Sequence, residues 1–330
     1  MDTFKAFRIY NENDKVAGRV VDTSLDELKP AEVVFRTAYS SVNYKDALAG
    51  TGTGGKIIRS YPLTGGIDAA GTVVSSTDPR VKPGDAVICT SYDMGVAHDG
   101  GYGEYCRVPA DWIVPLPQGL TLFEAMALGT AGYTAGLAVE LLELNGLAAG
   151  KGKVLVNGAT GGVATLAIDM LARSGYDVTA VTGKESEQGF LKDLGAREVL
   201  LRGALDLGKR PLEKSLWAAA FDSVGGEQLA WLTRTMLPEG LIASFGNAGG
   251  IELDTTVLPF ILRGVRLIGV NSATTPMPLR RKVWQRLATD LKPQHLDRIA
   301  YTIGLEDLPG QFDKLLKGQA RGRAVVKIPS

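Results

Sequence analysis

Two patterns of hydrophobic and polar positions divide this chain of 330 residues. Before about residue 120, apolar and polar residues alternate in short runs that Gly, Pro and Asp interrupt, as at 32–38, 71–75 and 86–90. This alternation predicts β-strands connected by long loops. From about Phe123 the apolar residues take helical spacing in a stretch rich in Ala, Leu and Gly. A domain boundary is therefore expected near residue 123.

Beyond this boundary, strand-like apolar runs alternate with segments of helical spacing. Strands are expected at 153–158, 176–183, 198–201, 217–224, 240–247 and 266–272, with helices that include 162–173, 185–194 and 228–236. Such alternation is typical of βαβ crossovers in one doubly wound parallel sheet, an α/β nucleotide-binding architecture. The tail, 299–329, returns to strand-like runs and is expected to fold back onto the β-rich part. We therefore predict a β-rich domain of residues 1–123 and 297–330 and an α/β domain of residues 124–296.

Charge and composition narrow the class of partner. Lys plus Arg (36) equal Asp plus Glu (36), so no overall field draws the chain to nucleic acid or to an anionic membrane, and a small ligand is favoured. The opening segment alternates like a strand, and no apolar stretch is expected to reach the roughly 18 residues that span a bilayer. With two cysteines and no CxxC, a reduced compartment is the default. A cytoplasmic protein is expected.

A glycine-rich turn follows the first strand of the α/β domain. In KVLVNGATGGV, Gly158, Gly161 and Gly162 stand where a helix begins, so backbone N–H groups can approach a pyrophosphate at the positive end of that helix. Close packing of a helix on a strand would also select small residues. The place of the turn, at the first strand-to-helix junction, favours a dinucleotide site.

The end of the second strand bears on the choice of cofactor. Sites for NAD usually carry a carboxylate there, which binds the ribose hydroxyls. Here the tip reads Thr182, Gly183 and Lys184, and Arg202 follows the third strand. A hydroxyl, a bare backbone and two cations suit a 2′-phosphate, so NADPH is predicted. The alternative is that both cations are solvated surface charges.

Zinc chemistry is tested by counting ligands. A catalytic zinc needs three protein ligands and a structural zinc four, mostly Cys or His. The chain holds His98, His295, Cys89 and Cys106, with no ligand-like spacing. No metal site is predicted, and a carbonyl would have to be polarised by hydrogen-bond donors.

A series of segments resembles the medium-chain dehydrogenase/reductase superfamily, in its zinc-free quinone-oxidoreductase-like branch. These segments are SSVNYKDAL, PLTGGIDAAGTV, VKPGDAVI, GGYGEYCRVPADWIVPLP and NGATGGV, and the resemblance extends over nearly the whole chain. Zinc-containing relatives carry a His-Glu pair where this chain reads GGIDAAG. Within the branch, NYKDAL, NGATGGVA, VTGK, FDSVGG, LPFILRGVRLIGVNS and GRAVVKI look most like the acrylyl-CoA reductase (NADPH) group.

The resemblance implies a GroES-like catalytic domain and a Rossmann domain, with the nicotinamide in the cleft between them and Tyr44 beside it. It also implies a homodimer, formed through the sixth strand region, 266–272. The implied NADPH contacts, besides Tyr44 and the glycines, are Thr160, Val163, Thr182 to Lys184, Arg202, Asn247, Ile261 and Ser272. For the last three, the alternatives are a turn Asn, a core Ile and a turn Ser.

The expected chemistry follows from the charge that develops on an enoyl thioester. Hydride delivered to its β-carbon leaves negative charge on the thioester oxygen, so a hydrogen-bond donor at that oxygen matters most. Tyr44 and Asn43 are the candidate catalytic donors, although Tyr44 would alternatively only wall the nicotinamide. Asp46 and Asp68 are expected to hold loops through Asx-type hydrogen bonds rather than to act as bases.

A CoA thioester substrate would also need cations for its phosphates. Lys56 and Arg59 lie on a glycine-flanked loop, and 279–287 is the densest basic run, although such a run is ordinarily the solvated face of a helix. Three functions stay open at this point: an NADPH-dependent reductase of a short enoyl-CoA such as acrylyl-CoA, an NADPH-dependent quinone or enone reductase, and a protein that binds NADPH without turnover.

Overall fold

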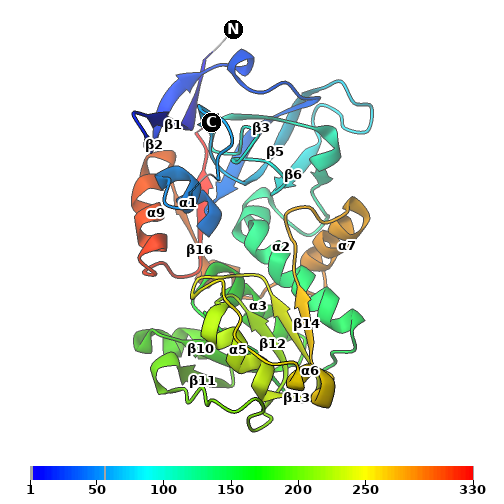
Figure 1. The fold of residues 1–330 in the computed structure, drawn as a ribbon. Helices are drawn as coiled ribbons and strands as arrows, with labels where there is room; N and C mark the ends of the chain where they lie inside the picture. The colour runs from blue at the N-terminus through cyan, green and yellow to red at the C-terminus, as the bar shows by residue number, and fades with distance from the viewer. Residues whose placement is uncertain (1–2, 56, 330) are drawn as a thin grey trace. The chain divides into compact units, whose positions relative to one another are not determined.

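The computed structural model describes residues 3–55 and 57–329. The chain forms two compact units (Figure 1). The first comprises Met1–Ala131, Ala273–Ala288 and Leu296–Ser330, and the second comprises Gly132–Ser272 and Thr289–His295. Residues 273–288, which the sequence analysis assigned to the α/β domain, thus make their contacts within the first unit.

The first unit is rich in β-strands, as the alternating pattern predicted, and these strands form two sheets. A seven-stranded sheet has the order β15-β16-β3-β5-β6-β8, with β7 pairing β3, and a three-stranded sheet has the order β2-β1-β4. The strands are β1 (Phe4–Glu12), β2 (Lys15–Thr23), β3 (Val33–Ser41), β4 (Leu63–Thr64), β5 (Asp68–Ser76), β6 (Ala86–Thr90), β7 (Tyr105–Val108), β8 (Val114–Pro115), β15 (Ala300–Ile303) and β16 (Arg323–Lys327).

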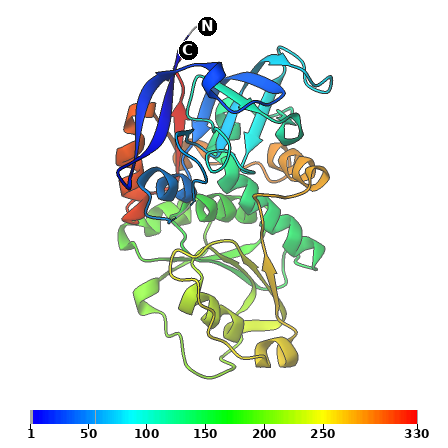
Figure 2. The same cartoon turned by 45° about the horizontal axis from the view of Figure 1, so that its top comes forward.

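The end of the chain completes this unit. Strand β16 pairs antiparallel with β3, with Val325 opposite Ser41, so the last strand lies beside strands from the first part of the chain (Figure 2). The tail therefore folds back as its strand-like pattern predicted. The unit also holds α7 (Met277–Ala288), α8 (Leu296–Ile299) and the short 3₁₀ helices η1 (Leu25–Glu27), η2 (Ala110–Trp112) and η5 (Leu305–Asp307).

Two further helices pack closely enough to fix the position of Tyr44. Helices α1 (Tyr44–Thr51) and α9 (Leu308–Leu316) meet at Gly50, where a Cβ atom would lie 2.5 Å from Cε2 of Phe312. The Phe312 ring meets Phe7 edge-on, with 5.9 Å between the ring centroids. Since these aromatic rings are buried, α1 is seated on a packed core that holds its first residue, Tyr44, in place.

The second unit is a doubly wound parallel sheet, which confirms the predicted fold class. Its order is β11-β10-β9-β12-β13-β14, and all its pairs run parallel. Because the order reverses between β9 and β12, the turn after β9 lies at the point where such sheets bind nucleotides. The strands are β9 (Lys153–Val156), β10 (Asp177–Thr182), β11 (Glu198–Leu201), β12 (Trp217–Asp222), β13 (Met236–Ser244) and β14 (Arg266–Gly269).

The helices of this unit follow the predicted pattern with two differences. They are α3 (Gly162–Arg173), α4 (Gln188–Asp193), α5 (Gly226–Thr235) and α6 (Leu258–Arg263), with η3 (Glu185–Glu187) and η4 (Arg202–Ala204). The predicted helix 185–194 is split into η3 and α4. Helix α6 was not predicted, because six residues that begin at Leu258-Pro259 give too short a run for a helical period to be recognised.

Helix α2 (Leu122–Leu144) corrects the expectation that no apolar stretch is long enough to cross a bilayer. It has 23 residues, and a window of it has a mean hydropathy of 1.3, which meets the length and composition of a membrane span. However, 89% of that window is buried inside the protein. Helices hydrophobic on all sides are also typical of protein cores, and α2 is such a helix.

Helix α2 is broken at Gly129, which has φ 52° and ψ −155°. A Cβ atom there would lie 2.5 Å from Oδ2 of Asp68, 2.6 Å from Oγ of Ser41 and 2.7 Å from Nη2 of Arg323. The break lets the backbone N–H of Thr130 donate to Asp68 Oδ2 at 2.9 Å. Only glycine combines this backbone conformation with the space that the three polar groups leave.

We predict that Gly129→Ala lowers the free energy of unfolding by about 2–4 kcal/mol, because the new methyl group meets both backbone strain and a filled site. Gly310→Ala is the control: Gly310 lies in α9, has open space around its Cβ position, and should gain about 0.4–1 kcal/mol. Urea unfolding of both full-length variants measures the difference. Equal midpoints would contradict the account of Gly129.

Candidate functional site

The glycine-rich turn is attached to the strand beside it. Gly158 has φ 56°, and a Cβ atom there would lie 2.3 Å from Oγ of Ser223. The Ser223 hydroxyl donates to the carbonyl of Asn157 at 3.0 Å, and its N–H donates to Asn157 Oδ1 at 2.8 Å. Asn157 Nδ2 in turn donates to Asp222 Oδ1 at 2.6 Å. The turn after β9 therefore requires glycine at 158 and is held by the end of β12.

Sequence reasoning missed this attachment. Asp222 is fully buried, and that burial raises its pKa above the ordinary value for a carboxyl group. Its oxygens also accept the N–H groups of Val224 and Gly225 at 3.1–3.2 Å. The signal was present in the motifs NGATGGVA and FDSVGG, each of which places a polar residue directly at the end of a buried strand.

The start of α3 suits an anion. Gly161 is its N-cap and the first turn of the described helix carries no acidic residue. The predicted contacts Thr160 and Val163 flank this point, together with Gly161 and Gly162. Since the first N–H groups of a helix have no partner inside it, the turn offers backbone donors at the positive end of the helix dipole.

The predicted basic tip also comes together. Thr182 Oγ1 accepts the N–H of Lys184 at 3.0 Å, which fixes the bend after β10. The guanidinium of Arg202, which follows the adjacent strand β11, lies over Gly183: a Cβ atom at Gly183 would be 3.1 Å from Nη2 of Arg202. A side chain at 183 would thus require the guanidinium to shift by a few tenths of an ångström. The cations of Lys184 and Arg202 and the buried hydroxyl of Thr182 therefore lie together at the carboxyl ends of neighbouring parallel strands.

Two of the three later candidates lie at the same edge of the sheet and one does not. Asn247 is exposed in the loop after β13, and Ser272 follows β14. Ile261 instead lies, 70% exposed, on α6. The Arg263 side chain at the end of α6 donates to the carbonyls of Arg234 and Met236, which places this helix at the amino end of β13. Ile261 therefore does not lie with Asn247 and Ser272 at the carboxyl ends of the strands.

Tyr44 and Asn43 begin helix α1 in the first unit. Asn43 is the N-cap and forms a capping box with Asp46, whose Oδ2 accepts the Asn43 N–H at 2.8 Å. Tyr44 is the first helical residue and is 44% exposed. The phenol is thus presented from a fixed helix start. An exposed tyrosine at such a place can donate a hydrogen bond to a ligand.

Asn43 does not have a free side chain to act as a catalytic donor. Its Nδ2 donates to Asp68 Oδ2 at 2.8 Å and to Asp46 Oδ2 at 3.3 Å, and its Oδ1 accepts from Arg323 Nη1 at 3.0 Å. Its exposure is 9%. Donor and acceptor are both engaged within the protein, so the expectation that Asn43 stabilises substrate charge gives way to a positioning role.

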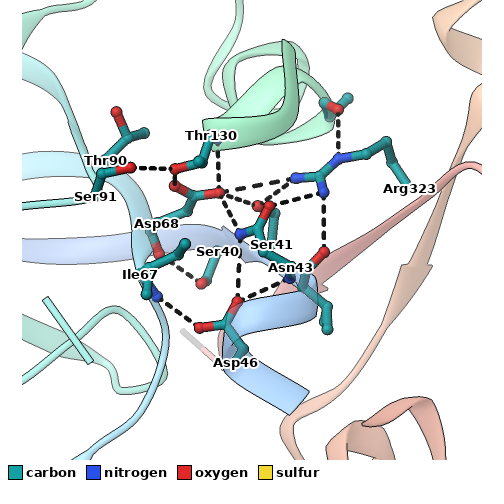
Figure 3. Close-up of polar contacts among 12 residues, drawn as sticks. Ser40, Ser41, Asn43, Asp46, Ile67, Asp68, Thr90, Ser91, Thr130 and Arg323 are labelled. Atoms are coloured by element: carbon teal, nitrogen blue, oxygen red, sulfur yellow. Dashed lines mark hydrogen bonds and ion pairs between the residues drawn. The ribbon is translucent and has the colours of Figure 1, made fainter. Parts of the chain in front are cut away.

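Asp68 is the centre of this polar cluster (Figure 3). Its carboxylate accepts from Ser41 Oγ at 2.6 Å, Thr130 Oγ1 at 2.5 Å and the Thr130 N–H, and it faces Arg323 Nη2 at 3.8 Å. Arg323 also donates to carbonyls of Val42 and Ala127. The predicted loop-holding role of Asp68 is consistent with these bonds, although its partners come from four separate parts of the chain.

The basic run 279–287 is only partly a solvated face. Arg280 is fully buried and donates to the carbonyl and hydroxyl of Thr90, each at 3.1 Å, with its guanidinium 4.4 Å from the centroid of Tyr92. Arg59 pairs with Asp93 at 3.7 Å. Lys56 lies outside the described residues. Arg280 is therefore a structural residue and cannot bind a CoA phosphate.

Within residues 3–55 and 57–329, no three His, Cys, Asp or Glu side chains are arranged to hold a metal ion. Both cysteines are free thiols and buried, and burial raises the pKa of each thiol. His295 instead lies against Asp169, with Nδ1 3.2 Å from Oδ2.

Known proteins give matches over the whole chain. Residues 29–118 match the alcohol dehydrogenase GroES-like domain. A Bacillus subtilis protein, whose name of quinone oxidoreductase YhfP is provisional, is 49% identical over 98% of this chain and 99% of its own length. The acrylyl-CoA reductase AcuI of Ruegeria pomeroyi is 46% identical over 96% of both chains.

Solved structures agree. The Salmonella enterica yhdH oxidoreductase in complex with NADP has a TM-score of 0.96 at 45% identity, covering 98% of this chain and 100% of that chain. The B. subtilis yhfP structure with NAD bound has a TM-score of 0.97 at 48% identity, covering 99% and 100%. With identities this high over nearly its full length, the chain belongs to the quinone-oxidoreductase-like branch of the medium-chain dehydrogenase/reductase superfamily.

Proposed function

We propose that this protein reduces the carbon-carbon double bond of a short enoyl-CoA, acrylyl-CoA above all, with NADPH as the hydride donor. The observation that carries the choice of cofactor is the tip after β10, where Lys184 and Arg202 flank the bare backbone of Gly183. The substrate is supported by the 46% identity to the acrylyl-CoA reductase of R. pomeroyi.

The residues of the second unit suit the parts of NADPH in turn. The start of α3, at Thr160 to Val163, would bind the pyrophosphate through backbone N–H groups. Thr182, Lys184 and Arg202 would bind the 2′-phosphate, for which guanidinium and ammonium groups are the strong partners. Asn247 and Ser272 are the proposed contacts nearer the nicotinamide, and Ile261 has no such support.

Tyr44 is the proposed catalytic donor. When bound, NADPH would supply a hydride to the β-carbon, and the substrate oxygen would carry negative charge until the α-carbon takes up a proton from solvent. A phenol that donates a hydrogen bond to this oxygen stabilises the developing charge. Asn43 acts by holding the start of α1 through its bonds to Asp46, Asp68 and Arg323.

The second candidate function is reduction of a quinone or enone by the same cofactor. The observation that favours it is the 49% identity to the B. subtilis protein named a quinone oxidoreductase. Such a substrate needs no site for CoA phosphates, and the charge of Arg59 is paired with Asp93.

We also propose that the protein is a homodimer joined through β14. This strand is the last in the order of its sheet, and its Leu267 and Ile268 are only half-buried. Helix α6, which leads into β14, exposes Ile261 and Leu262 by 70% and 63%. An edge strand beside exposed apolar side chains suits pairing with a second copy.

Lys184→Ala should weaken NADPH binding about ten- to a hundredfold while changing NADH binding less than about threefold, because one charge-assisted contact to the 2′-phosphate is lost. Fluorescence titration with both cofactors measures the ratio. Lys192→Ala, an exposed lysine on α4, is the matched control and should leave both affinities unchanged. Equal weakening for NADPH and NADH would rule out the proposed phosphate site.

Tyr44→Phe should lower kcat with acrylyl-CoA about tenfold or more while leaving the NADPH dissociation constant within about twofold, since it removes a donor without removing the ring. Steady-state kinetics and cofactor titration provide the two numbers. Tyr10→Phe, a half-buried tyrosine on β1, serves as control. A variant with full turnover would leave Tyr44 as a wall of the site only.

The function itself is tested by following NADPH oxidation with acrylyl-CoA, crotonyl-CoA and a simple benzoquinone, with NADH as the comparison. Acrylyl-CoA with NADPH should give the highest kcat/KM. A preference for the benzoquinone would assign the protein to the second candidate function. Tight NADPH binding with no turnover of any acceptor would identify a non-catalytic NADPH-binding protein.

A further inference from the structure

The polar cluster beneath Tyr44 contains two buried carboxylates and one buried guanidinium. Asp46, Asp68 and Arg323 are exposed by 3%, 0% and 2%. Arg323 faces Asp68 at 3.8 Å, and the side chain of Asn43 lies between the two carboxylates. If both carboxylates are ionised, the cluster carries one negative charge that no cation balances. Buried charge of this kind is costly, so the cluster is sensitive to one added proton.

Asp46 is placed so that its ionised form holds the start of α1. Its Oδ2 accepts the N–H of Asn43 at 2.8 Å and Asn43 Nδ2 at 3.3 Å, and its Oδ1 accepts the N–H of Ile67 at 2.9 Å (Figure 3). These bonds tie the residue before Tyr44 both to its own helix and to the segment that leads into β5. A carboxylate can accept at both oxygens, as this arrangement requires.

We propose that Asp46 is a positioning residue: its ionised form holds Tyr44 in the position from which the hydroxyl would donate to the substrate, and its protonated form releases Tyr44 from that position. This inference rests on the proposed catalytic role of Tyr44. Protonation adds a hydrogen, taken from solvent, to the carboxylate and removes its negative charge. A neutral carboxyl group is a weaker acceptor than a carboxylate, so the bonds from the N–H groups of Asn43 and Ile67 weaken.

The surroundings of Asp46 put this change in the physiological range. Burial, followed by the charge of Asp68, raises the pKa of Asp46 to about 7, against the lowering effect of its bonds to Asn43 and Ile67. The other titratable groups that act on the cluster include Tyr102, Tyr301, Cys89 and Arg323. Burial raises the pKa of the two phenols and of the thiol and lowers the pKa of the guanidinium. Among these groups and Asp46, it is the pKa of Asp46 that is raised into the neutral range.

The sign follows from the raised pKa. Between about pH 4 and pH 7 the folded protein holds a proton on Asp46 that the unfolded chain has lost. Raising the pH through 7 therefore removes folding stability while it restores the bonds that fix Tyr44. Below about pH 6 the protein is expected to have a higher free energy of unfolding than at pH 8. At the same pH the start of α1 is expected to be less ordered.

The first test uses the unaltered protein. Hydrogen exchange measured by mass spectrometry, and corrected for the intrinsic effect of pH, should show the amides of Asn43 and Ile67 about ninefold less protected at pH 6 than at pH 8, as the ionised fraction falls from about nine tenths to one tenth. The kcat should fall by a similar factor across the same range. Protection that does not change with pH would overturn the proposal.

The second test removes the titration. Asp46→Asn keeps the shape of the side chain but has a single acceptor oxygen, so it should lower kcat at pH 8 about ten- to a hundredfold. The variant should also lose the change of kcat with pH near pH 7, and its KM for NADPH should be unchanged. Asp307→Asn is the matched control, because Asp307 makes the same capping bond, to Gly304 at 2.8 Å, from an exposed position in the same unit. The Asp307→Asn variant should keep the change of kcat with pH near pH 7.

A double variant separates this inference from the proposed function. If Asp46 acts through the Tyr44 hydroxyl, Asp46→Asn should lower kcat less than about twofold in the Tyr44→Phe background. Effects of Asp46→Asn that are equal in both backgrounds would overturn the positioning role. Full turnover of Tyr44→Phe alone would instead overturn the catalytic role of Tyr44, whereas the exchange measurement on Asn43 and Ile67 reports on Asp46 independently of turnover.

Discussion

The first unit depends on the hydrogen bonds and the ion pair that stabilise the buried carboxylate of Asp68, which has no access to water. Its hydrogen-bond donors come from β3, the loop before α1 and the break in α2, and the guanidinium of Arg323 on the last strand of the chain faces it as an ion pair. Removing one partner of such a buried pair typically costs about 3–5 kcal/mol, since the remaining charge stays buried and unpaired. The same contacts that keep this charge buried therefore also fix the residues around Tyr44, and stability and site geometry share one set of bonds.

The architecture was largely predictable because it follows from local patterns. Alternating apolar runs indicated the β-rich unit, and strands separated by helical segments indicated the parallel sheet. The glycine turn after β9 and the basic tip after β10 were also visible, because parallel strands bring their carboxyl ends to one edge whatever the details of packing. Whether those residues bind NADPH stays a prediction.

What could not be predicted depends on contacts between distant residues. The sequence offered Asn43 as a donor for substrate, but its side chain is used up by Asp68 and Arg323, which lie 25 and 280 residues away. Arg280 looked like part of a solvated basic face, yet Thr90 and Tyr92 enclose it. Ile261 was expected on a loop and lies on a short helix at the opposite edge of the sheet from the glycine turn. Charge and polarity in a sequence do not reveal which polar side chains will bind one another within the fold and which will be available to a ligand.

The late position of Arg323 also bears on how the protein is made. The second unit is nearly continuous in sequence, from Gly132 to Ser272, so it can form on the ribosome once that stretch has emerged. The first unit cannot be completed then, because β16 and its arginine follow that stretch in the sequence. Until they are made, Asp68 lacks Arg323 beside it and β3 lacks its pairing partners at Tyr39, Ser40 and Ser41. The unit that contains β1 therefore finishes folding after the second unit, and it is the unit that removal of β16 would leave incomplete.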